Sequence, residues 1–170
     1  MTHAPDFAEA LQAWRVWRVV RLEGDLALAS VVQRTVWPAG EELAAGCLAH
    51  QSLLDRLRKR PKHDAPQVDC CCGVYATDLE HVTRYLAEMS VWRATFVLGQ
   101  VSLWGTVIEC DRGFRASYAY PSRIYVPSYG RHGVEAEECV MGLLRYDVPV
   151  EKLAGPPAEA GRVLAERLAA

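Results

Sequence analysis

The sequence predicts an α+β fold, namely a curved, mainly antiparallel sheet or a small partly open barrel packed by two or three helices. Two observations carry this prediction: residues 96–120 alternate in polarity around a tight turn, and apolar residues within 79–89 recur at helical spacing. A chain of 170 residues fits one domain. We therefore expect a single domain over 1–170 with a core of about 14–150, in which residues 1–12 and 155–170 are peripheral.

The first elements are predicted to be strands. Residues 14–22 alternate in part, which is typical of a strand, and Gly24 lies in the turn that follows. Residues 26–37 are rich in β-branched side chains and predict a second strand that is closed by Pro38. The two strands would pair as a hairpin across the turn.

The period of the apolar residues changes after Gly40. Between Leu43 and Leu57 they share one helical face, which predicts a helix over residues 41–60 that ends in basic side chains before Pro61. A polar loop over 61–69 then leads into the cysteine triplet 70–72 and a short strand over 73–76.

The second half of the chain is predicted from a cap, a hairpin and two helical patterns. Thr77 and Glu80 have the spacing of a capping box, which predicts a helix to about Met89. Gly113 supplies a positive φ in the loop of the hairpin, and Pro121 would end its second strand. The remaining predicted elements are hairpin strands over 96–110 and 114–120, a strand over 124–126, a helix over 135–146, and either a last helix or a frayed tail over 158–168.

Charge and hydropathy exclude some classes of protein. A formal net charge of −2 is not the broad positive field that holds many proteins on nucleic acid, although a local basic patch remains compatible with it. Residues 1–13 lack the pattern of a secretory signal, and no apolar run approaches the ~20 residues that cross a bilayer. We therefore expect a cytoplasmic protein with no membrane contact, whose six cysteines stay reduced.

Four side chains have the residue types and the spacing of candidate metal ligands. Cys47, His63, Cys70 and Cys72 together supply the thiolate and imidazole ligands that zinc prefers, and a structural zinc site takes four of them. In an extended segment Cys70 and Cys72 share one side, which leaves Cys71 pointing away. His50 is an alternative partner for Cys47, because residues three apart share a helical face.

Two other interpretations of the cysteines stay open. A thiol of the 70–72 triplet could act as a nucleophile with His63 as its base, which would make the chain a cysteine-dependent enzyme. Alternatively, the cysteines are small core residues and His63 is a solvated loop residue.

A second candidate site lies on the hairpin. Trp104, Arg115, Tyr118 and Tyr120 bring aromatic rings and a cation onto adjacent strands, and such a surface can stack on bases or planar ligands. The alternative is that the aromatic rings belong to the core. Glycine-rich phosphate loops, serine-hydrolase elbows and H-E-x-x-H helices are all absent from the sequence.

Two motifs resemble those of a family of uncharacterised bacterial proteins of unknown function. Residues 70–76 resemble C-x-C-G-[IV]-Y-A, and residues 99–121 resemble G-x-V-x-L-W-G-x-V-x-E followed by G-[FYW]-R-A-x-Y-A-x-P. With Trp37-Pro38 and the 63–66 loop, the resemblance spans residues 14–121. It implies no reaction, but it places weight on Cys70 and Cys72.

The sequence therefore favours a non-catalytic ligand-binding or interaction module with a structural zinc site. Its ligand would be a planar small molecule, a nucleic acid or a protein, and a homodimer is an open alternative. The alternatives for the function are a cysteine-dependent enzyme and a metal-free protein–protein interaction domain.

Overall fold

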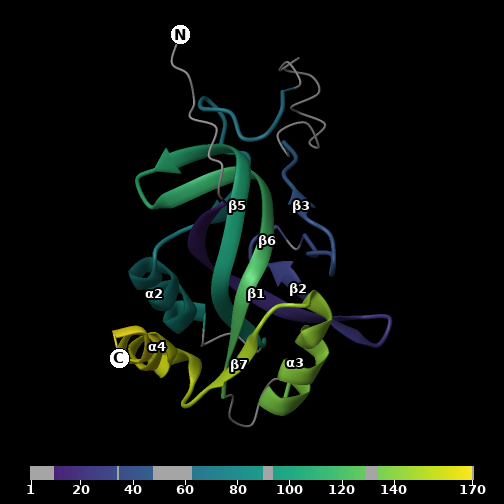
Figure 1. Cartoon of the computed structure of the whole chain (residues 1–170), viewed down its shortest axis with the longest axis vertical. Helices are drawn as coiled ribbons and strands as arrows, with labels where there is room; N and C mark the ends of the chain where they lie inside the picture. The colour runs from purple at the N-terminus through teal and green to yellow at the C-terminus, as the bar shows by residue number, and fades with distance from the viewer. Residues whose placement is uncertain (1–9, 34, 48–62, 90–93, 129–133, 170) are drawn as a thin grey trace.

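The computed structural model describes residues 10–33, 35–47, 63–89, 94–128 and 134–169 (Figure 1). Its strands are β1 (Leu11–Leu22), β2 (Asp25–Ser30), β3 (Leu43–Ala44), β4 (Val74–Ala76), β5 (Phe96–Cys110), β6 (Gly113–Pro127) and β7 (Val150–Leu153). Its helices are α2 (Leu79–Met89), α3 (Ala136–Leu143), the 3-10 helix η2 (Leu144–Tyr146) and α4 (Pro157–Ala169).

The strands form one mixed, mostly antiparallel sheet, which confirms the predicted α+β class. The strand order is β2-β1-β5-β6-β3, and β4 and β7 also pair with β6. Only the β6–β7 pair is parallel among the described strands. A single bridge between Trp14 and Thr77 returns the end of β4 to β1, so the sheet curls strongly without closing into a barrel.

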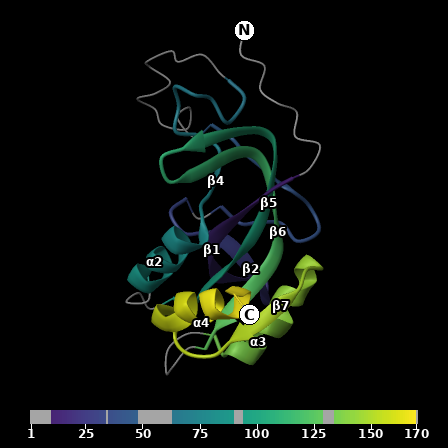
Figure 2. The same ribbon diagram turned by 60° about the vertical axis from the view of Figure 1, so that its left-hand side comes forward.

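Helices cover both faces of the sheet. On one side α2 and α4 lie next to each other, and α3 lies on the other side (Figures 1 and 2). Leu86 and Leu164 pack with Leu98 on the first face, whereas Cys139 and Leu143 pack with Val97 on the second. Val97 and Leu98 are consecutive residues that point to opposite faces, and both are fully buried, so the first part of β5 is buried on both faces.

The hairpin of β5 and β6 is the predicted one, but longer. Gly113 has a φ of +130°, as the turn requires. Strand β6 does not end at Pro121. Pro121 pairs with Val101 of β5, and the strand continues to Pro127. A bulge between Gln100 and Val101 accounts for the shift in register at this point. The separately predicted strand over 124–126 is therefore the second half of β6.

Two predictions in the N-terminal half are wrong. Strand β2 stops at Ser30 rather than Trp37, because the chain turns back so that Thr35 and Trp37 bond with the strand they follow. The predicted helix over 41–60 is not present over 41–47, where β3 instead pairs with β6. Residues 48–62, which include His50 and the rest of this prediction, lie outside the described residues.

The helical predictions need smaller corrections. Helix α2 is capped by Asp78 rather than Thr77: the Asp78 carboxylate accepts the His81 N–H at 2.8 Å. Helix α4 is not peripheral in packing, since Ala160 and Leu164 are fully buried.

Strand β7 was not predicted. No helix in the described part of the chain is long and apolar enough to span a membrane.

Candidate metal centre

The four predicted metal ligands come together at one end of the sheet. The ligand atoms of Cys47, His63, Cys70 and Cys72, which we call the donor cluster, all lie within 4.8 Å of one another. The sulfurs of Cys47 and Cys70 are 3.7 Å apart, and the Cys72 sulfur is 3.9 Å from Nδ1 of His63. Cys72 is buried and the other three are half-buried. This group of side chains could hold a metal ion.

Strand β6 brings the separate ligand segments together. Pairing of β3 with β6 continues as a hydrogen bond from the Ala45 N–H to the Ser117 carbonyl, two residues before Cys47. The Ser117 hydroxyl donates to the Ala65 carbonyl at 2.9 Å, two residues after His63. Cys72 is followed by Gly73 and then β4, which also pairs with β6. One strand therefore positions every ligand-bearing segment.

Gly73 permits the close approach of the third segment. Its φ is +123°, a conformation that other residues rarely adopt. A Cβ at this position would lie 3.0 Å from the Cβ atoms of both Arg115 and Pro66. A side chain at this position would therefore strain the path of the chain from Cys72 into β4.

Arg115 holds the loop that carries two of the sulfurs. Its Nη1 donates to the backbone carbonyls of Gln67, Cys70 and Cys72, and its Nε donates to the Cys110 sulfur at 3.1 Å. Only 7% of Arg115 is exposed. The structure thus engages its guanidinium with the loop, whereas the sequence placed it on a ligand-facing surface. Nothing in the spacing of residues 63–72 indicated that this loop covers β6.

The surroundings of the sulfurs favour a thiolate at one position. The backbone N–H of Cys72 donates to the Cys70 sulfur, and together with its other hydrogen bonds this lowers the pKa of Cys70 to about 7. Burial raises the pKa of Cys72. A hydrogen bond to the Asp64 carbonyl, 2.9 Å from Nδ1, raises the pKa of His63. A cation at the centre of the cluster would interact with Cys70 in its charged form near neutral pH.

Cys71 stands apart from this arrangement, as the alternation of the triplet predicted. It is exposed, and its backbone carbonyl accepts the Tyr75 hydroxyl at 2.6 Å. Its thiol is not part of the donor cluster.

The other hairpin residues of the predicted ligand surface separate into two groups. Trp104 and Tyr118 face each other across β5 and β6, with ring centroids 6.1 Å apart and planes 19° from parallel. Tyr118 is exposed. The Tyr120 hydroxyl instead accepts the Gly40 N–H and donates to the Tyr146 carbonyl, which ties β6 to neighbouring loops.

Comparison of the chain with protein-family models, with curated proteins and with solved structures gives no significant match. The fold and the donor cluster therefore define the class on their own: an α+β protein with a candidate metal centre formed by three cysteines and a histidine.

Proposed function

We propose that this chain is a non-catalytic binding module built around a structural zinc ion held by Cys47, His63, Cys70 and Cys72. The observation that carries the proposal is the convergence of these four side chains from three segments of the chain. A structural zinc site uses four protein ligands, which leaves no open position for a substrate.

The distances in the donor cluster support a tetrahedral ion. With Zn–S bonds of about 2.3 Å and a Zn–N bond of about 2.05 Å, a tetrahedron has S–S edges of about 3.8 Å and S–N edges of about 3.6 Å. The separation of the Cys47 and Cys70 sulfurs is 3.7 Å. The Cys72 sulfur lies 3.9 Å from Nδ1 of His63, and this nitrogen would give up its hydrogen bond to the Asp64 carbonyl when it binds the ion. Small side-chain adjustments would bring both pairs to the values of a bound ion.

The position of the cluster gives the ion a structural role. The segments of Cys47, His63 and Cys70 contain little regular structure of their own, and short loops of this kind gain order from a shared ion. Zinc binding to such sites contributes on the order of 10 kcal/mol at neutral pH. The ion would therefore stabilise the fold at this end of the sheet.

Metal analysis with single substitutions tests the proposal. Protein purified without chelator should contain about one zinc ion per chain, and cobalt substitution should give the visible bands of tetrahedral Co²⁺. Cys47→Ser and Cys72→Ser should lose the metal, whereas Cys71→Ser, a neighbouring cysteine outside the cluster, should retain it. A metal-free protein that zinc does not stabilise would refute the proposal and favour a metal-free interaction domain.

One observation favours a cysteine-dependent enzyme as the second candidate. The pKa of Cys70 is lowered to about 7, and an imidazole lies within the same cluster, as a nucleophile and its base would. A catalytic pair needs one thiol, however, and here three sulfurs converge with the ring. Thiol labelling at pH 7 separates the two: a zinc site makes Cys71 the fast-reacting residue of the triplet, whereas an enzyme makes Cys70 faster.

The stacked pair of Trp104 and Tyr118 is the ligand surface within this proposal. Two parallel aromatic rings on an exposed hairpin support the binding of a planar group or a base. Trp104→Ala should abolish binding to a single-stranded oligonucleotide if a base is the ligand, with no change in metal content.

A further inference from the structure

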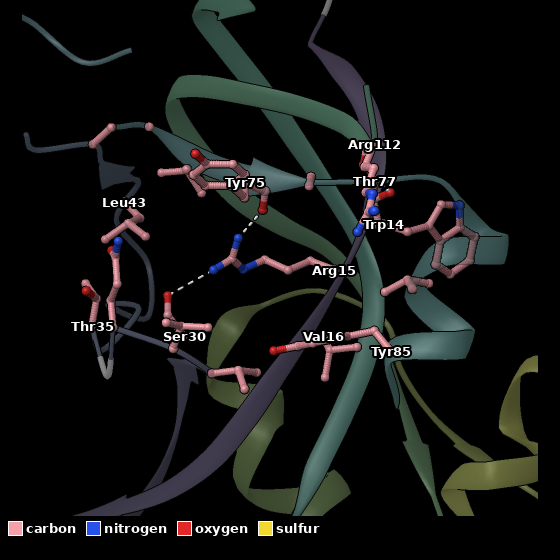
Figure 3. A pocket seen from close by; sticks show the side chains of 18 of the residues that line it. Trp14, Arg15, Val16, Ser30, Thr35, Leu43, Tyr75, Thr77, Tyr85 and Arg112 are labelled. Atoms are coloured by element: carbon pink, nitrogen blue, oxygen red, sulfur yellow. Dashed lines mark hydrogen bonds between the residues drawn. The ribbon is translucent and has the colours of Figure 1, made fainter. Parts of the chain in front are cut away.

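A separate cavity lies beside β1, and its lining includes neither Trp104 nor Tyr118. Its volume is about 600 Å³, which is within the usual range for small-molecule sites. Residues from β1, the end of β2, β3 and β4 line it, together with Val82 and Tyr85 of α2 (Figure 3). Of the described lining residues, about half are apolar and none is acidic.

Arg15 dominates the polar part of this cavity. Its side chain extends from β1 so that the guanidinium reaches toward Tyr75 and Ser30 (Figure 3). It donates to the Tyr75 carbonyl and, at 3.0 Å, to the Ser30 hydroxyl. The Cζ atom of its guanidinium lies over the ring of Trp37, 5.1 Å from the ring centroid.

The charge of Arg15 has no carboxylate partner among the described residues. No ion pair is formed by it there, and its Nε is buried without a hydrogen-bond acceptor. Burial lowers the pKa of Arg15 to about 10, so the group is still charged at neutral pH. A half-buried cation without a counterion among the described residues is unfavourable, and an anionic ligand would relieve this cost.

We propose that this cavity binds an organic carboxylate with an apolar body, whose carboxylate group pairs with Arg15. The two Nη atoms each keep an N–H beyond the bonds described above, and a planar guanidinium suits a carboxylate. Arg112, at the edge of the cavity beside Thr77, adds a second positive charge. The apolar lining formed by residues such as Leu43, Val74 and Val82 would hold the rest of the ligand.

The cavity is also connected to the donor cluster along the chain. Lining residues Leu43–Gly46 lead directly into Cys47, and lining residues Gly73–Thr77 directly follow Cys72. A zinc ion would therefore hold two walls of the cavity in place. This coupling rests on the proposed zinc site, whereas the carboxylate site itself rests on the cavity and on Arg15.

Calorimetric titration of the full, zinc-loaded chain with three ten-carbon probes tests the proposal. Decanoate should bind at least about tenfold tighter than decanol, and decylammonium should not bind measurably, because hydrogen bonds to a charged group are worth about 10- to 100-fold. Each methylene removed from decanoate should weaken binding by up to about fourfold. Equal affinities for decanoate and decanol would overturn the proposal, as would displacement of decanoate by inorganic phosphate at equal concentration.

Variants identify the residue responsible. Arg15→Met should reduce decanoate affinity to that of decanol, whereas Arg84→Met, which removes an exposed arginine outside the cavity, should leave it unchanged. Since Arg15 also bonds two strands, Arg15→Lys serves if the methionine variant unfolds, and an intermediate affinity is expected. Wild-type affinity in either Arg15 variant would overturn the proposal.

The two proposals fail in different ways. If the protein contains its zinc but does not bind decanoate, the carboxylate site is refuted and the zinc site stands. If the protein is purified without metal, is not stabilised by added zinc and still binds decanoate through Arg15, the zinc site is refuted and the carboxylate site stands.

Discussion

Replacing Arg115 by methionine should weaken zinc binding without removing any ligand. The substitution keeps much of the side-chain volume but removes the donors to three loop carbonyls. The Cys72 carbonyl is the most buried of these acceptors, and leaving it unsatisfied costs about 1–3 kcal/mol. The partly buried Cys70 carbonyl adds about 1 kcal/mol, whereas water can replace the donor at the exposed Gln67.

The expected loss for the ordered loop is therefore about 2–4 kcal/mol, which corresponds to about 30- to 900-fold in zinc affinity. Competition with a chromophoric chelator measures this affinity. Arg123→Met is the matched control, because Arg123 lies on the same strand but pairs with Glu151 at a partly exposed site worth under about 1 kcal/mol. Zinc affinity within twofold of wild type in Arg115→Met, or equal losses in both variants, would refute the reasoning.

Burial, backbone conformation and protonation each give one further expected outcome. Leu164→Ala should lower the free energy of unfolding in urea by about 2–5 kcal/mol because it empties a fully buried position between α4 and α2, whereas exposed Leu168→Ala should cost under about 1 kcal/mol; similar losses would contradict this packing. Gly73→Ala should reduce zinc affinity measurably in the same competition assay, whereas Gly46→Ala, where an added Cβ meets no atom within 4 Å, should not; the same affinity in both would contradict the steric argument. Zinc binding should release about one to two more protons at pH 6 than at pH 8. The reason is that Cys70, with a pKa of about 7, and the imidazole of His63, with a raised pKa, hold protons at pH 6 that the metal displaces. Calorimetry in buffers of different ionisation enthalpy measures the release, and equal release at both pH values would argue against these ligands.

Local sequence patterns were sufficient to predict the elements that are specified by residues close to one another in the sequence. The alternation of 96–110 and the turn at Gly113 specify a hairpin, since both its register and its turn are encoded within a few residues. Helix α2 was also predicted, because Val82 and Leu86 repeat at helical spacing and both are buried.

The segment after Gly40 could not be predicted from its own residues. Leu43 and Cys47 are four apart, and this spacing is typical of a helical face. In the structure Leu43 instead pairs with Ala119, which is 76 residues further along the chain (119 − 43). A pairing over this distance decides the local structure, and it leaves no trace in a short window of sequence.

The residues around the candidate sites were harder to predict than the ligands. Cysteine and histidine mark a metal site by residue type, so the donor cluster could be proposed from the chemistry of these side chains. Arg115 and Arg15 look like ordinary polar positions of alternating strands. A sign of burial was present for Arg15, because it shares its strand face with Trp17 and Val19. For Arg115 the covering loop is distant in sequence, and no such sign existed.

Strand β6 links the two candidate sites mechanically. It pairs with β3 and β4, and through Arg115 and Ser117 it also holds the loops of the donor cluster. The connections from these loops to the cavity walls are short: Ala44 is three residues from Cys47, and Val74 is two residues from Cys72. A chain this short between a fixed ligand and a paired strand cannot absorb a shift of the ligand by bending alone. Loss of the zinc ion would therefore displace the walls near Arg15. The affinity for the carboxylate should then change when zinc is removed, although the carboxylate does not contact the zinc ion.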